Sequence, residues 1–482
     1  MNKLLCGAMA LLLCLSVSAQ EKWDLRRAVD YALANNISVK QADLQVRYAE
    51  LNEKLARGAQ LPNLNFGLNA GYNFGLNENP TTGTLQNVKN LSTTANLQSG
   101  ATLFNWFSLK HNREAARINI LAEQAQVTKA QNDIALNVAV SYLQILLARE
   151  QEKVVEVQVQ QTISQLEVTR KRVAAGLLPE LNAAELEAQL ASDSTALITA
   201  RGSSQQLLLQ MKALLSLDAA TPFDVVAPPV SLIPVEDLAD LAPDRVFEMA
   251  VANLPQQKVN SLRLQAAAER VASARGQLYP VISAFGSLNT RYLHLRQPLY
   301  KQVLSGYQTT GLRADAGSGT FYAVQSPVYV AGDKTGTYYT TDPLGTQLSE
   351  NFGQQLGVSV QVPIFNGYRA RSAVSRARLD VRQLQLQDTL DRQTLKQDIY
   401  RAYNDAVTSI QKYNASRKSV AAAEKANEFA QKRFAANLLS TYDVINTQSR
   451  LVQARINMLS AQFDYVFRLK LLEFYKGQGL KL

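Results

Sequence analysis

The chain has 482 residues, and its 50 Lys and Arg exceed its 40 Asp and Glu to give a formal net charge of +10. The basic residues are scattered among acidic ones instead of gathering with aromatic residues, which argues against nucleic-acid binding. Both cysteines, Cys6 and Cys14, lie at the amino terminus. A chain cleaved after them would have no disulfides and would depend on packing, size or oligomerisation.

The amino-terminal segment has the order of a secretory signal peptide. Lys3 is followed by an apolar run from Leu4 to Leu15 and then by Val17-Ser18-Ala19. We predict a signal peptide over 1–19, cleaved after Ala19. A lipid attached to Cys14 is the alternative, although Leu13 stands where a small residue is wanted.

After helical pieces at about 24–58, the first predicted strand covers about 63–75. Every second residue is apolar or aromatic, and Asn or Gly stands between them. Such alternation suits a strand between core and water, or a strand between lipid and a wet pore. For the second case we expect a lipid face made of Leu64, Phe66, Leu68, Ala70, Tyr72 and Phe74.

A second alternating strand at about 91–104 leads into a long helix at about 105–176. No proline occurs between Pro80 and Pro179, and the apolar residues have helical spacing. We expect Gly176 to end this rod in the left-handed conformation, and a returning helix to cover about 180–216.

The pattern then repeats. A proline-rich linker over 218–243 separates a first repeat (20–217) from a second (244–478), with predicted strands at about 280–291 and 354–365. A long helix at about 366–437 and a returning helix at about 442–475 follow, with Ser440 or Thr441 as the helix N-cap. The segment from Phe104 to Arg172 equals in length that from Phe365 to Arg433.

Four strands of this length can cross an outer membrane but cannot close a barrel alone. The duplicated order comes with the helix–strand junctions ARGAQLPNL, ARGQLYPVI, LFNW and IFNG, and with the turns RVAAGLLPELNAAE and RFAANLLSTYDVINTQ. In these features the chain resembles the TolC-like outer-membrane efflux protein family. The resemblance covers about residues 22–475.

The resemblance implies a mainly α chain with a transmembrane β-barrel. Three protomers would each give four strands to one 12-stranded barrel, which continues into a long periplasmic α-helical barrel. The expected function is a passive exit duct in the outer membrane. Its expected partners are two other copies, a periplasmic adaptor, an inner-membrane pump driven by protons or ATP, and outer-membrane lipid.

The resemblance also points to a periplasmic gate at the second turn. Phe434 stands where a gating tyrosine is often found, and Leu439 where an arginine is often found. Asp443 matches the first aspartate of the mouth, and Asn446 replaces the second. An apolar constriction that closes by dewetting is one interpretation. In the other, Phe434 and Leu439 only pack between helices.

Adaptor docking is expected at the helix tips, in the helix-in-groove manner. The residues concerned are Arg172, Gly176, Leu177, Arg433, Asn437 and Leu438. The tyrosine-rich segment from about 291 to 350 is expected to be a long extracellular loop.

We find no pattern for a catalytic, cofactor or metal site. His111 and His294 fall in different contexts, and the Gly-rich GSGTF near residue 317 lies in a Tyr- and Thr-rich stretch. An exported enzyme therefore has little support. An exported coiled-coil structural or surface protein would explain the rods, but not the alternating strands before them or the repeat.

Overall fold

The computed structural model describes residues 22–78, 85–226, 236, 238–317, 319–339, 342–436 and 438–477. The chain forms two compact units. One is helical and comprises Met1–Lys54, Asn112–Val271 and Val374–Leu482, and the other carries the sheet and comprises Leu55–His111 and Ala272–Ala373. The predicted signal peptide lies outside the described residues.

The duplication predicted from the sequence appears as two series of helices of matched length. The first series is α2 (Leu25–Asn35), α3 (Ile37–Gly58), α4 (Ser108–Ala174) and α5 (Glu180–Leu215), with 11, 22, 67 and 36 residues. The second is α6 (Pro243–Asn253), α7 (Pro255–Gly276), α9 (Arg369–Ala435) and α10 (Thr441–Tyr475), with 11, 22, 67 and 35. A 3-10 turn, η2 (Leu238–Leu241), precedes α6.

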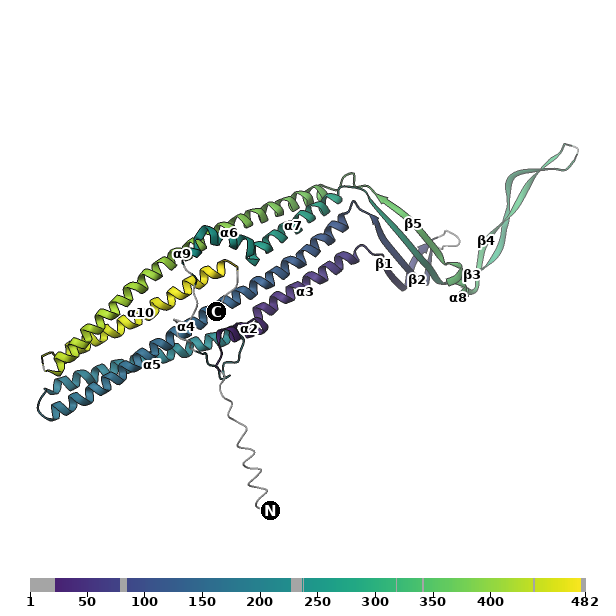
Figure 1. Cartoon of the computed structure of the whole chain (residues 1–482). Helices are drawn as coiled ribbons and strands as arrows, with labels where there is room; N and C mark the ends of the chain where they lie inside the picture. The colour runs from purple at the N-terminus through teal and green to yellow at the C-terminus, as the bar shows by residue number, and fades with distance from the viewer. Residues whose placement is uncertain are drawn as a thin grey trace, which may run out of the picture. The chain divides into compact units, whose positions relative to one another are not determined.

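Each rod is about 100 Å long at 1.5 Å per residue. Within the helical unit, α4 runs beside α5 and α9 beside α10 as two hairpins (Figure 1).

In each repeat the helical segment before the sheet is interrupted once, between α2 and α3 in the first repeat and between α6 and α7 in the second. An asparagine at each interruption bonds to the end of the returning helix. The Asn36 side chain donates to the Leu214 carbonyl at the end of α5 (2.8 Å), and Asn253 donates to the Lys476 carbonyl after α10 (3.1 Å). These bonds satisfy carbonyls that a helix end leaves without a partner. Both repeats therefore join the end of a returning helix to the break in the same way.

Two apolar clusters hold the helical unit together. In one, Val138 and Ile145 of α4 pack with Met211 of α5 and with α2. In the other, Ile399 of α9 packs with Leu472 of α10 and with α6. Each fully buried side chain of this size contributes about 1.5–3 kcal/mol relative to exposure. The rods are thus anchored where the short helices cover them.

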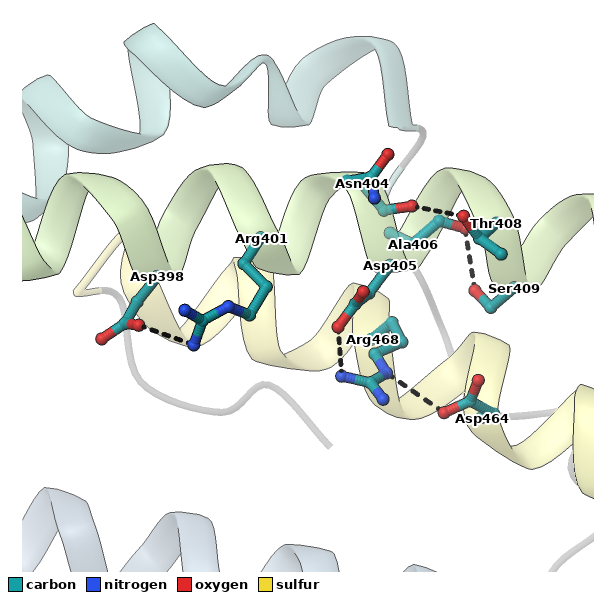
Figure 2. A network of polar contacts seen from close by, with 9 residues as sticks. All are labelled: Asp398, Arg401, Asn404, Asp405, Ala406, Thr408, Ser409, Asp464 and Arg468. Carbon is teal, nitrogen blue, oxygen red and sulfur yellow. Dashed lines mark hydrogen bonds and ion pairs between the residues drawn. The ribbon is translucent and has the colours of Figure 1, made fainter.

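Polar contacts support the second hairpin. Arg468 of α10 contacts Asp405 of α9 (2.7 Å) and Asp464 one turn earlier in α10 (3.1 Å), as Figure 2 shows. All three side chains are roughly one-third exposed, so we expect a modest contribution from these pairs.

The sheet consists of β1 (Asn63–Glu78), β2 (Leu85–Phe104), β3 (Val281–Asp315), β4 (Phe321–Tyr339) and β5 (Gly353–Gln361). The described pairings between these five strands are antiparallel: β1 with β2, β2 with β3, and β3 with both β4 and β5. Both predicted strands of the first repeat are longer than expected. β1 continues to Glu78, beyond the predicted end at about residue 75, and β2 begins at Leu85 rather than Leu91. In the path β1-β2-β3-β5, the outer strands β1 and β5 each pair with one described neighbour.

The prediction of a loop from 291 to 350 is wrong. After its pairing with β5 ends at Asn289, β3 continues and pairs with β4 from Arg296 to Asp315. A short helix, α8 (Leu344–Glu350), follows. The register shifts repeatedly along this hairpin, and such bulges break the alternation on which strand prediction depends.

Candidate functional site

The sheet carries one apolar face, built from residues that lie directly opposite each other. Phe66 faces Leu97, and Leu97 faces Leu288 on the third strand. The predicted lipid-face residues of β1 share this face. Ala70 is exposed, and the five larger ones are each more than 60% exposed: Leu64, Phe66, Leu68, Tyr72 and Phe74. On the edge strand β5, Leu356 is 90% exposed on the same face. A broad apolar surface therefore has no covering within the described chain.

The opposite face is polar and rich in amides. One row across the four strands reads Asn65, Gln98, Ser287 and Gln355, and the next reads Gly67, Asn96, Asn289 and Gly353. A Cβ at Gly67 would clash with the Asn96 carboxamide, and one at Gly353 with that of Asn289. The glycines thus let the asparagine side chains lie flat across their neighbours.

Aromatic side chains gather at both ends of the apolar face. At the helix end, the Trp106 ring lies 5.4 Å from that of Phe104 and 4.8 Å from that of Tyr279. At the far end, the rings of Tyr72 and Phe74 stack at 6.1 Å. Aromatic girdles in these positions border the apolar band of outer-membrane strands.

The junction of β2 and α4 also explains why the helix starts later than predicted. Trp106 and Phe107 have φ values of 53° and 61°. Bulky residues rarely adopt this left-handed region, and packing must stabilise it. The Phe104 ring contacts both residues, and α4 begins only at Ser108.

The predicted caps of the helix tips are confirmed. Gly176 has φ +73°, and the Leu177 amide donates to the Arg172 carbonyl (2.9 Å), which closes α4 as a Schellman motif. At the second tip the Ser440 side chain accepts from the Asp443 amide (3.2 Å), as the N-cap of α10. The Asp443 carboxylate accepts from the Ser440 hydroxyl at 2.6 Å.

The candidate gate residues do not form one cluster within a single chain. Phe434 is half-buried and, with Arg172, lines a groove of about 660 Å³ between α4, α9 and α10. Leu439 and Asn446 are half-buried, whereas Asp443 is exposed in the first turn of α10, beside its N-cap Ser440.

The docking candidates lie at the tips with different exposure. Leu177 and Leu438 are 68% and 67% exposed. Gly176 and Arg433 are also exposed, Arg172 is half-buried, and Asn437 lies outside the described residues.

A link between the two tips was not predicted. The Asn182 side chain near the start of α5 donates to the Thr441 hydroxyl at the start of α10 (2.7 Å), and Thr441 is 1% exposed. The sequence gives no signal for this bond, because both residues suit any helix start. It ties the first hairpin to the second at the end where a gate is expected.

The amino-terminal residues attach to the linker beside α4. Trp23 forms a parallel bridge with Val225, and Arg149 pairs with Asp224. The Tyr142 hydroxyl donates to the Val226 carbonyl, and burial, aided by the charge of Asp24, raises the pKa of Tyr142 to about 12. This attachment is structural, because its polar groups pair with one another.

Among the described residues, no group of three or more His, Cys, Asp or Glu could hold a metal ion. Within the same ranges, no helix is long and apolar enough to cross a membrane.

Comparison with known proteins identifies the family to which this chain belongs. The family described as "Outer membrane efflux protein" matches residues 28–216 and 334–477. Outer membrane efflux protein BepC of Brucella suis biovar 1 (strain 1330) is 21% identical over 445 residues, covering 92% of this chain and 82% of that one. Alkaline protease secretion protein AprF of Pseudomonas aeruginosa is 22% identical over 452 residues, with the same coverage.

The crystal structure of CusC superposes with a TM-score of 0.74 at 17% identity, covering 96% of this chain and 93% of that one. The predicted fold class is confirmed. With its family match, its two repeats and its two-faced sheet, the chain belongs to the outer membrane efflux protein family and is an outer-membrane efflux channel that extends into the periplasm.

Proposed function

We propose that three copies of this chain close one 12-stranded barrel and form a passive exit duct, without catalysis. The single observation that carries this proposal is a two-faced sheet whose outer strands, β1 and β5, each pair with one described strand. At about 4.8 Å between strands, four strands make a ribbon roughly 19 Å wide, which cannot close on itself. Pairing of β1 with β5 of another copy would remove both edges.

The apolar face has the size that membrane insertion requires. From Leu64 to Phe74, β1 extends about 33 Å at 3.3 Å per residue, or roughly 23 Å in depth at a 45° tilt. This depth matches the apolar band of outer-membrane barrels. We assign Leu64, Phe66, Leu68, Tyr72 and Phe74 to lipid and the amide-rich face to the lumen.

The helix tips are the proposed docking surface for a periplasmic adaptor, through which an inner-membrane pump delivers cargo. Exposed Leu177 and Leu438 flank the two turns and present apolar side chains to water. With Arg172, Gly176, Arg433 and Asn437, they would receive a helical partner in the helix-in-groove manner.

The proposed gate lies at the same end. Three copies of Asp443 would form a carboxylate ring, and Phe434 and Leu439 an apolar constriction. Half-burial of Phe434 and Leu439 in one chain also supports the alternative that they only pack between helices. Leakage through Leu439→Ser and Asp443→Ala trimers distinguishes the two, because packing alone predicts unchanged leakage.

Fractionation and reconstitution test the duct. We expect the chain in the outer membrane as a trimer that dissociates on heating in SDS, and single channels when it is reconstituted in planar bilayers. A soluble monomer, or a membrane-bound chain without conductance, would contradict the proposal.

A further inference from the structure

One positive charge stands out on the polar face of the sheet. The Asn69 row continues through Thr94 to Arg291 on β3. Among the described residues paired in the ladders β1–β2, β2–β3 and β3–β5, Arg291 is the only charged side chain on this face, and no carboxylate of those ladders shares it. The Arg291 side chain is exposed. Its neighbours on the face are therefore uncharged: Thr94 lies opposite, and Asn289 and Leu293 lie on either side of it along β3.

The backbone at Arg291 is held on both sides. On one side it pairs with Thr94 of β2. On the other side the ladder with β5 has ended, and the Asn351 side chain donates to the Arg291 carbonyl (2.8 Å). Two residues further on, the Gln347 carboxamide accepts from the Leu293 amide (3.0 Å) and donates to the Leu293 carbonyl (3.1 Å). These side chains bond to β3 where β5 no longer pairs with it, so the backbone of β3 at Arg291 is held in place.

We propose that three copies of Arg291 form a cationic ring inside the barrel, which favours anionic solutes and anionic cargo over cations. This inference rests on the proposed trimer and on the assignment of the polar face to the lumen. Rings of Arg or Lys give pores a preference for anions.

The size of the barrel makes the ring effective. Twelve strands spaced about 4.8 Å apart and tilted about 40° give a barrel of roughly 12 Å radius. Six bonds of about 1.5 Å carry a guanidinium roughly 6 Å inward from the strand. The charges then lie about 6 Å from the axis, which is within the Debye length of about 8 Å at physiological salt. Three such charges change the anion concentration on the axis about five-fold.

Selectivity measurements on intact trimers test the ring. We compare wild type with Arg291→Gln, Arg291→Lys and Lys89→Gln in planar bilayers under a KCl gradient. Lys89 is the matched control, because it pairs with Phe74 on the apolar face of the same sheet. We expect Arg291→Gln to lower the chloride-to-potassium permeability ratio at least two-fold, with little change in the ratio for Arg291→Lys and Lys89→Gln.

The possible failures are distinguishable. If the wild type conducts but Arg291→Gln leaves the ratio unchanged, the ring is refuted while the duct stands. An equal or larger effect of Lys89→Gln would also overturn the ring, since it would put the other face toward the lumen. If the wild type forms no channels, the proposed function fails and the ring fails with it.

Discussion

A lysine placed on either face of β1 tests which side meets lipid. Leu68 lies near the middle of the apolar stretch, is 61% exposed and pairs with Ala95. Leu68→Lys puts a charge on the apolar face, and a lysine near the bilayer midplane costs about 2–4 kcal/mol per chain. Asn65→Lys places the same charge on the amide face, opposite Gln98, where water solvates it. For that variant we expect a change within about 0.5 kcal/mol.

The assay is urea unfolding of each variant from phosphatidylcholine vesicles, together with the yield of heat-sensitive trimer in outer membranes. At about 1.4 kcal/mol per ten-fold change, the expected cost lowers the folding equilibrium of Leu68→Lys by roughly 30- to 1,000-fold. Equal stability of the two variants would refute a lipid face. Greater damage from Asn65→Lys would show that the faces are reversed.

Three further predictions concern the helices. Thr441→Val removes the acceptor of the Asn182 hydrogen bond at the tips, so we expect the free energy of unfolding to fall by about 0.5–1.5 kcal/mol and a large antibiotic to enter more readily. In a double-mutant cycle, Asn182→Ala should add nothing to this loss. Additive losses would contradict the link. Ser440→Ala removes the N-cap of α10 and should cost about 1 kcal/mol in thermal unfolding, whereas Ser440→Asp should keep most of the stability. Because burial raises the pKa of Tyr142 to about 12, unfolded chains release this proton first as the pH rises above 10, and stability falls between about pH 10 and 12; Tyr142→Phe should flatten that decline, and an unchanged slope would argue against it.

Local pattern was enough to predict much of this fold. The proline-free stretches and their helical spacing gave two rods of equal length, and Gly176 and Ser440 marked their ends because caps depend on local chemistry. Alternation around Leu64 and Phe66 gave the two faces of β1. The β3–β4 hairpin was missed because its register shifts hide the alternation.

Contacts between distant segments could not be read from the chain. The Asn182–Thr441 bond joins residues 259 positions apart. The side chains of Gln347 and Asn351 bond to the backbone of β3 beyond the end of its ladder with β5, and no local pattern predicts these contacts. Only the register across β1, β2 and β3 isolates Arg291 on the polar face, because facing residues depend on strand pairing. The sequence by itself determined the rods, their caps and the two-faced strands, since periodicity and capping are local. The tertiary structure decided which side chains meet, since such pairs form only when distant segments pack together.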